Sequence, residues 1–324
     1  MRGLLSVVLI AGLAWGGWWF FGATAQKSGL ESWFSERRAA GWTAEYEDLE
    51  VTGFPNRFDT ILTAMDLKNP EGWGWNVPQL HVYALSYKPN HIIAAIPDVQ
   101  AVATPTGPIN IVSTLFQSSL IFKPETSLAL DRWQLEVEEL LAVAPDWKAA
   151  VGSASFALVD AGREVPAYNL YIQGLEIKVP KRWRKMSGQR GRIPETHVDA
   201  TLIFDRPLDR FAVENGNPSF KVINIRDAHF EWGSVDLNAS GRLTVAKNGR
   251  LNGDLTFQTR DWRSLFEIAK AAGLIPRSQE DNWETGLTII AGFSGNDEEI
   301  EAAIRFERGE MFLGIIPLGP APRF

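Results

Sequence analysis

The sequence predicts a mainly β protein: a curved antiparallel sheet or open groove with few short helices, preceded by one N-terminal transmembrane helix. Three observations carry this prediction. An apolar run opens the chain, most later segments alternate apolar and polar residues with a period of two, and Gly, Pro and Asn separate those segments. With 324 residues, 45% of them apolar, the chain is long enough to bury a sizeable core.

The first segment, GLLSVVLIAGLAWGGWWFF at residues 3–21, is uncharged. As a helix it would span about 28 Å, close to the thickness of the hydrocarbon core of a bilayer. Trp15, Trp18 and Trp19 lie near its C-terminal end, and amphipathic rings favour the membrane–water boundary. We expect residues 1–25 to form a transmembrane signal anchor whose boundary these three rings mark.

A signal peptide cleaved after Ala25 is the competing interpretation, because Ala23-Thr24-Ala25 has the small-x-small form of a cleavage site. Two features favour the anchor. The apolar run is longer than the usual apolar region of a signal peptide, about 7–15 residues, and bulky rings stand just before the cut.

The orientation of the anchor depends on the flanking charges and on the size of the body attached to it. Arg2 and the free amine lie on one side and Lys27 on the other, so the charge bias alone is weak. A large body after an N-terminal anchor favours export of that body. We therefore expect a single-pass protein of the inner membrane, with the N-terminus in the cytoplasm and the body in the periplasm.

A short helix is expected next, over residues 26–41. Leu30, Trp33 and Phe34 fall on one helical face, and Gly41 is a natural C-terminal stop. It connects the anchor to the body and packs against the body or lies on the membrane surface. We expect residues 42–324 to form a single β-rich domain, because no low-complexity linker interrupts them.

Within that domain the alternation is clearest in HVDATLIFD, where Val198, Ala200, Leu202 and Phe204 share one face. Asn248-Gly249 predicts a two-residue hairpin between two short strands that contain residues 243–245 and 255–257. One strand is expected around 300–306. The other expected strands lie around 44–52, 58–67, 79–87, 91–104, 109–122, 127–140, 153–160, 168–179, 220–231 and 234–240.

Two further segments are not strands. RDWRSLFEIAKAAGLIP predicts a helix capped by Asp261 and ended by Gly273, with Leu265 and Ile268 in its apolar stripe. The basic run KRWRKMSGQRGR at residues 181–192 is expected to be a solvated loop. Contact with anionic lipid headgroups is its alternative.

Composition and motifs exclude several functions. A net charge of −7 argues against nucleic acid as a partner, and the lack of cysteine removes thiol catalysis and thiolate metal sites. His81, His91, His197 and His229 lie on separate expected strands without metal-ligand spacing. No nucleotide-binding or hydrolase motif is present. We therefore expect no enzyme activity, no catalytic residues, no cofactor and no metal.

The stretch GFPNRFD at residues 53–59 forms a corner between two expected strands. Pro55 and Asn56 suit a β-turn, Arg57 and Asp59 share one strand face, and Phe58 takes the other. We expect a structural corner with an Arg–Asp contact. The functional alternative makes Arg57 a contact for a lipid or its headgroup.

The hydrophobic anchor, the Trp-rich boundary, GFPNRFD and the terminal GEMFLGIIPLGPAPRF together resemble an uncharacterised alphaproteobacterial membrane-anchored family, the domain of unknown function numbered 2125. More distantly, residues 239–276 resemble the closing segment of AsmA-like proteins, in which hairpins precede a short helix. That second resemblance implies an extended curved β-sheet in the periplasm, with links to envelope assembly and lipid movement.

The leading expectation is a non-enzymatic periplasmic protein of the cell envelope that binds or passes a phospholipid or another amphiphile along an apolar β-groove. The alternative is a scaffold protein of an envelope complex with no small ligand. The sequence names no protein partner. The 13 tryptophans fit a large core, and they would suit an elongated apolar ligand if several line one concave face.

Overall fold

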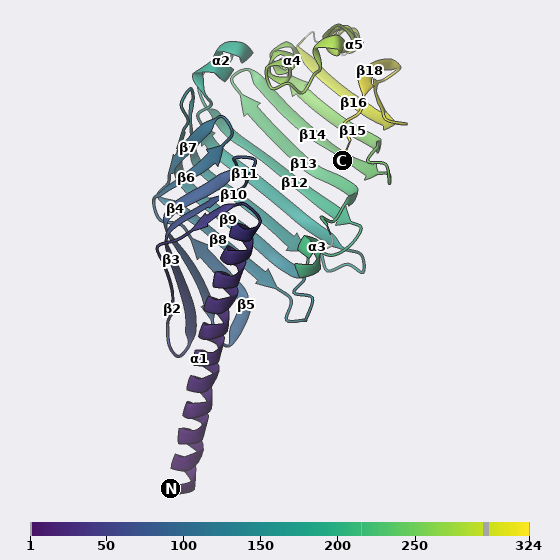
Figure 1. Cartoon of the computed structure of the whole chain (residues 1–324). Helices are drawn as coiled ribbons and strands as arrows, with labels where there is room; N and C mark the ends of the chain where they lie inside the picture. Colours follow the sequence, from purple (N-terminus) through teal and green to yellow (C-terminus); the bar gives the residue numbers. More distant parts are fainter. Residues whose placement is uncertain (1, 215, 294–297, 324) are drawn as a thin grey trace. The chain divides into compact units, whose positions relative to one another are not determined.

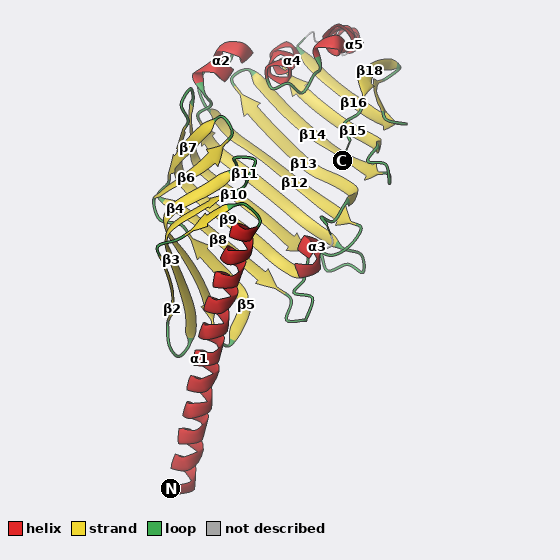
Figure 2. Ribbon diagram, in the orientation of Figure 1, coloured by secondary structure: helices red, strands yellow, loops and turns green. Residues whose placement is uncertain are grey.

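The computed structural model describes residues 2–214, 216–293 and 298–323 (Figures 1 and 2). It is mostly β with antiparallel strand pairing and few helices, which confirms the predicted fold class. The chain divides into two compact units: Met1–Pro124 with Leu135–Asp146, and Glu125–Gln134 with Trp147–Phe324. A single domain over residues 42–324 stays a prediction.

The first unit begins with one long helix, α1 (Arg2–Ala39), which continues without a break through the expected boundary at residue 25. It is long and apolar enough to span a membrane. Its first half is exposed, whereas Trp19, Ala23 and Phe34 are buried against the strands of this unit. Because these residues follow one another at roughly helical spacing, one stripe of the C-terminal half packs on the sheet.

Short strands with turn residues between them complete this unit. Two expected strands, 91–104 and 109–122, each divide in two, the first at Pro97, which has no backbone N–H for the ladder. β3 pairs with β1, β2 and β4, and β4 pairs with β5 and β6. The strands are β1 (Thr43–Glu45), β2 (Asp48–Thr52), β3 (Arg57–Lys68), β4 (Gly74–Leu85), β5 (Lys88–Ala95), β6 (Val99–Thr104), β7 (Gly107–Val112), β8 (Leu115–Phe122) and β9 (Leu130–Val143), the last with residues in both units.

The second unit is an antiparallel meander in which every strand from β10 to β18 pairs with the next (Figure 1). The hairpin predicted at Asn248-Gly249 is confirmed, but its turn is longer than two residues, because Val245 pairs with Leu251 and residues 246–250 lie between them. Its strands are β10 (Lys148–Asp160), β11 (Ala167–Ile177), β12 (Ile193–Phe204), β13 (Phe220–Trp232), β14 (Val235–Val245), β15 (Leu251–Arg260), β16 (Glu299–Glu307), β17 (Glu310–Leu313) and β18 (Ile316–Pro320).

The helices of this unit agree only in part with the sequence patterns. α4 (Trp262–Ala271) is confirmed, with Asp261 as its N-cap. The prediction of a loop for the basic run is wrong in its first part, which forms α2 (Lys181–Ser187). No sequence pattern predicts α5 (Glu280–Phe293), α3 (Arg210–Glu214) or the 3-10 turn Arg277–Gln279.

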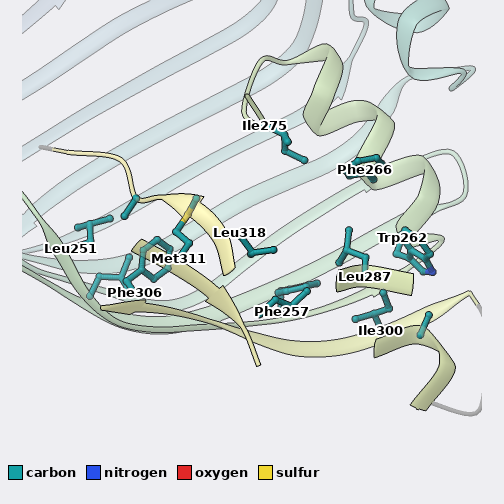
Figure 3. Close-up of a cluster of buried hydrophobic side chains, with 14 of the residues drawn as sticks. Leu251, Phe257, Trp262, Phe266, Ile275, Leu287, Ile300, Phe306, Met311 and Leu318 are labelled. Atoms are coloured by element: carbon teal, nitrogen blue, oxygen red, sulfur yellow. The ribbon is translucent and has the colours of Figure 1, made fainter. Parts of the chain in front are cut away.

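The main core of the second unit lies between β14–β18 and the helices α4 and α5 (Figure 3). Trp262 and Phe266 of α4 and Leu287 of α5 are buried against Phe257 and Ile300 of the sheet. α4 begins directly after β15, so the chain turns from the sheet into the helix that covers its apolar face.

Candidate functional site

One face of the sheet in the second unit is apolar across seven strands. Side chains at paired positions of neighbouring strands point to the same face, and the strand registers therefore form two apolar rows on this face. The first row is Phe156, Ile172, Val198, Ala228, Ala239, Phe257 and Ala302. The second row runs beside it and is Leu158, Leu170, Ala200, Ile225, Gly241, Leu255 and Ile304.

Within the second unit, the helices cover one end of this apolar face more fully than the other. Over β14–β16 it is covered by α4 and α5, which form the core described above. Over β10–β13 the row is only partly covered, and the side chain of Ile172 is 42% exposed. A contiguous apolar patch, and not a single exposed residue, marks a binding surface. Here Phe156, Ile172, Val198 and Ala228 lie side by side and each is at least partly exposed.

The covered end contains a cavity of about 310 Å³ between the sheet face and the two helices. That volume lies at the lower end of the range of small-molecule sites. Among the described residues, none with an ionisable side chain lines it. The lining residues are Leu237, Ala239, Leu255, Phe257, Thr259, Trp262, Leu265, Phe266, Ala269, Leu274, Ile275, Trp283, Leu287 and Ile304.

Local sequence features hold the helical wall of this cavity in place. Asp261 caps α4: its carboxylate accepts a hydrogen bond from the backbone N–H of Ser264 at 3.1 Å and another from the hydroxyl of Ser234. Burial raises the pKa of this carboxyl, but these hydrogen bonds outweigh it and hold the pKa below the ordinary value. The cap therefore favours an ionised Asp261 at neutral pH.

One residue of the cavity lining has a buried polar atom without a partner. Nε1 of Trp283 is buried and makes no hydrogen bond within the part of the chain that the structure describes. A buried N–H without an acceptor is unfavourable by about 1–3 kcal/mol. The lining itself is apolar, so chemically the site can hold an apolar chain.

The opposite face of the same sheet is polar. Gln173, His197, His229, Asn238 and Gln258 follow one another in register across β11–β15. One alternation therefore separates an apolar face from a hydrated face.

The polar face brings together two histidines that are far apart in the sequence. The ring centroids of His197 and His229 are 5.6 Å apart. Nε2 of His197 lies 2.7 Å from Asp227 Oδ2, and its Nδ1 lies 3.4 Å from Glu195 Oε1. The hydrogen bond with Asp227, with help from Glu195, raises the pKa of His197. Only the register of the two consecutive strands β12 and β13, which places His197 opposite His229, could have shown this pair.

Metal binding finds no support in this cluster or elsewhere in the described ranges. Across residues 2–214, 216–293 and 298–323, no three His, Asp or Glu side chains are arranged to hold an ion. The His197 cluster is better described as a network of ion pairs on a hydrated sheet face.

The residues singled out by sequence lie in the first unit, where the structure brings Arg57 and Trp19 together. Nε1 of Trp19 donates a hydrogen bond to the backbone oxygen of Arg57 at 2.6 Å, and Nε1 of Trp18 donates one to the oxygen of Ser86 at 3.1 Å. Trp15 is 37% exposed on the same helix. Two of the three boundary rings therefore fix the helix to the corner and to the β4–β5 turn.

Arg57 itself forms the predicted contact with Asp59, through Nε at 3.0 Å and also through Nη2. The hydrogen bond from Arg57 to Asp59, followed by the Coulombic attraction between the two groups, raises the pKa of Arg57. Asp59 is buried, whereas the guanidinium remains more than half exposed. Contact of Arg57 with a lipid headgroup stays a prediction.

The two phenylalanines of the corner differ in burial. Phe58 is buried and its ring stacks against Trp19 at 6.2 Å between centroids. Phe54 contacts the rings of Trp19 and Phe20 but is 56% exposed. The peptide bond between Phe54 and Pro55 is cis. The corner is thus attached to the helix near the end of its apolar run.

Sequence reasoning missed the cavity. Leu265 of its wall belongs to the predicted apolar stripe of α4, but the opposing wall comes from β14–β16 and α5. Of the tryptophans weighed as ligand-lining residues, Trp262 and Trp283 line the cavity. The one available signal was the period-two alternation, which predicts an apolar face without showing what covers it.

A comparison with the curated proteins finds no match. A family model described as "Uncharacterized protein conserved in bacteria (DUF2125)" matches residues 19–322. The match includes the corner, the apolar face and the cavity. The chain therefore belongs to this bacterial family, DUF2125.

Proposed function

We propose that this chain is a non-enzymatic, membrane-anchored protein of the cell envelope that binds the acyl chain of a lipid or similar amphiphile in the second unit. The observation that carries the proposal is the cavity of about 310 Å³, whose described lining residues include no ionisable group and which is continuous with the apolar rows of the sheet. Apolar surface removed from water there contributes roughly 25 cal/mol per Å² to binding.

The composition of the lining favours binding over catalysis. General acid–base or nucleophilic chemistry needs a titratable or activated group beside the substrate. Thr259 is the one hydroxyl among the described lining residues, and it donates its hydrogen bond to the oxygen of Arg260. The likeness of residues 239–276 to AsmA-like proteins points the same way, because β14, β15 and α4 supply most of the lining.

Retention of the anchor is part of the proposal. Cleavage after Ala25 would remove Trp19 and Ala23, which are buried with Phe58. It would also remove the hydrogen bond from Trp19 to Arg57. We place the anchor in the inner membrane, the N-terminus in the cytoplasm and the body in the periplasm. A reporter enzyme that works only after export, fused to Phe324, should then be active.

The lipid proposal is tested with two neighbouring residues that face opposite sides of β14. Ala239 lines the cavity, whereas Ser240 is exposed on the other face. Ala239→Phe fills the cavity and Ser240→Phe is the matched control. The full chain, purified in mild detergent, is analysed by native mass spectrometry and by extraction of bound lipid.

We expect lipid to copurify with the wild type and with Ser240→Phe, and to be lost from Ala239→Phe. Thermal melting of each variant checks that the fold is intact. A wild type without bound lipid would reject the proposal and favour a scaffold protein. Equal lipid content in all three proteins would place any lipid outside the cavity.

A further inference from the structure

A second hollow in the same unit is basic. It has a volume of about 380 Å³ and lies where β10 and β11 meet α2 and the residues just after that helix. Ala149, Ala150 and Val179 form its apolar lining. The cationic lining residues are Lys148, Lys178, Lys181, Arg184 and Arg192. Five cations around one hollow are unexpected in a chain with a net charge of −7.

These cations are mostly without anionic partners. Arg192 pairs with Glu176 at 2.6 Å. Among the described residues, no carboxylate lies within ion-pair distance of the other four. Nε of Arg184 is buried and has no hydrogen-bond acceptor in the described chain. Unpaired cations held close together create a positive potential that attracts an anion.

The hollow lies at the end of the apolar face. Ala150 of β10 pairs with Lys178. Further along the same strand, Ala154 pairs with Gly174 and Phe156 with Ile172, so the register is the same at all three positions. Since side chains alternate along a strand, Ala150 belongs to the same face as Phe156. The distance along the strand between these two is roughly 20 Å at 3.3 Å per residue.

We propose that this basic hollow binds the anionic headgroup of a lipid whose acyl chain lies on the adjacent apolar face. The inference rests on the proposed function and adds the headgroup class to it. The apolar row would take the chain, and the lysines and arginines would take the phosphate or carboxylate. Arg184 lines the hollow and has no anionic partner among the described residues, so its guanidinium would add a charge-assisted hydrogen bond, and bonds of this kind are among the stronger ones.

The test compares two phospholipids with identical acyl chains, anionic phosphatidylglycerol and zwitterionic phosphatidylcholine. Each carries a pyrene label, and its binding to the full chain in detergent micelles is measured by energy transfer from tryptophan. The triple variant Lys148→Gln, Lys178→Gln, Lys181→Gln removes three exposed cations of the hollow. The control Arg163→Gln, Arg242→Gln, Lys247→Gln removes three exposed cations elsewhere in the same unit.

We expect the wild type to prefer phosphatidylglycerol by about tenfold or more, because each cation near an anionic lipid adds affinity that salt screens only in part. The hollow variant should lose this preference and keep its affinity for phosphatidylcholine. The control should behave as the wild type. The preference should shrink as salt is raised from about 50 to about 500 mM.

Three results would overturn the inference. The first is equal affinity of the wild type for both lipids, which leaves acyl-chain binding in place. The second is an equal loss in both triple variants, which shows an effect of net charge alone. The third is full competition by millimolar inorganic phosphate, which makes the hollow a site for free phosphate. Failure of either lipid to bind the wild type would instead reject the proposed function itself.

Discussion

The contact between Gly22 of α1 and Phe58 of the corner makes a sharp prediction about stability. An ideal Cβ built on Gly22 would lie 2.6 Å from Cζ of Phe58 and 3.2 Å from its Cε1. The Phe58 ring is 5% exposed and has little room to move. In Gly22→Ala the ring must therefore shift or the corner must separate from the helix.

The magnitude is set by two opposing effects. Overpacking of a closely packed site typically costs about 1–3 kcal/mol. Replacement of glycine by alanine within a helix gains roughly 0.5–1 kcal/mol. Gly29→Ala on the same helix isolates the second effect, because nothing lies within 4 Å of its Cβ position. We expect Gly22→Ala to be about 1–3 kcal/mol less stable than Gly29→Ala.

Urea unfolding of the full chain in detergent micelles, followed by tryptophan fluorescence, measures this difference. Hydrogen exchange adds a local reading, since the amide of Arg57 donates to the oxygen of Gly53 at 2.9 Å and should exchange faster in Gly22→Ala. If both alanine variants unfold at the same urea concentration with equal exchange at Arg57, the close approach of ring and helix does not contribute to stability.

Three further predictions concern the second unit. Asp261→Ala should lower the free energy of unfolding in urea by about 1 kcal/mol at pH 7, because it removes the cap of α4. The pKa of Asp261 is lowered in the folded state, so the greater stability of the wild type should disappear as the pH falls through that pKa. A stability difference at about pH 2 equal to that at pH 7 would contradict this prediction. The pKa of His197 is raised in the folded state, so its contact with Asp227 should stabilise the fold fully below about pH 6.5, and this stabilisation should be lost as the pH rises through the folded pKa. The free energy of unfolding of His197→Gln should therefore differ from that of the wild type more at about pH 5.5 than at about pH 8.5. A larger difference at the higher pH would refute the ion pair between His197 and Asp227. Trp283→Phe removes a buried donor without a partner, which is favourable, and part of a ring packed against the core, which is unfavourable. We therefore expect the lipid-free chain to stay within about 1 kcal/mol of wild type in thermal melting after delipidation, and a loss above about 2 kcal/mol would contradict this balance.

Local patterns predicted much of the fold. The apolar run indicated the helix, period-two alternation indicated most strands, and the Asn248-Gly249 turn and the Asp261 cap marked two boundaries correctly. Each of these features depends on residues close together in the chain. α5 was missed, because Gly286 and Gly292 interrupt its pattern and much of its stability comes from packing on the sheet.

The candidate site was less predictable. Arg57 and Asp59 are two residues apart, so their contact could be predicted from strand alternation alone. The hydrogen bond from Trp19 to Arg57 joins residues 38 apart. The basic run reads as a loop in the sequence, because a run of charges does not show that its neighbours β10 and β11 supply Lys148 and Lys178 to the same hollow.

The sequence by itself determined that the chain has a helix able to span a membrane, followed by strands with one apolar face, because both properties are periodicities of neighbouring residues. Only the tertiary structure decided which strands lie side by side, that α4 and α5 leave a cavity over that face, and that cations gather at its end. The reason is physical: strand register and helix packing are fixed by contacts between residues far apart in sequence, and no local pattern records them.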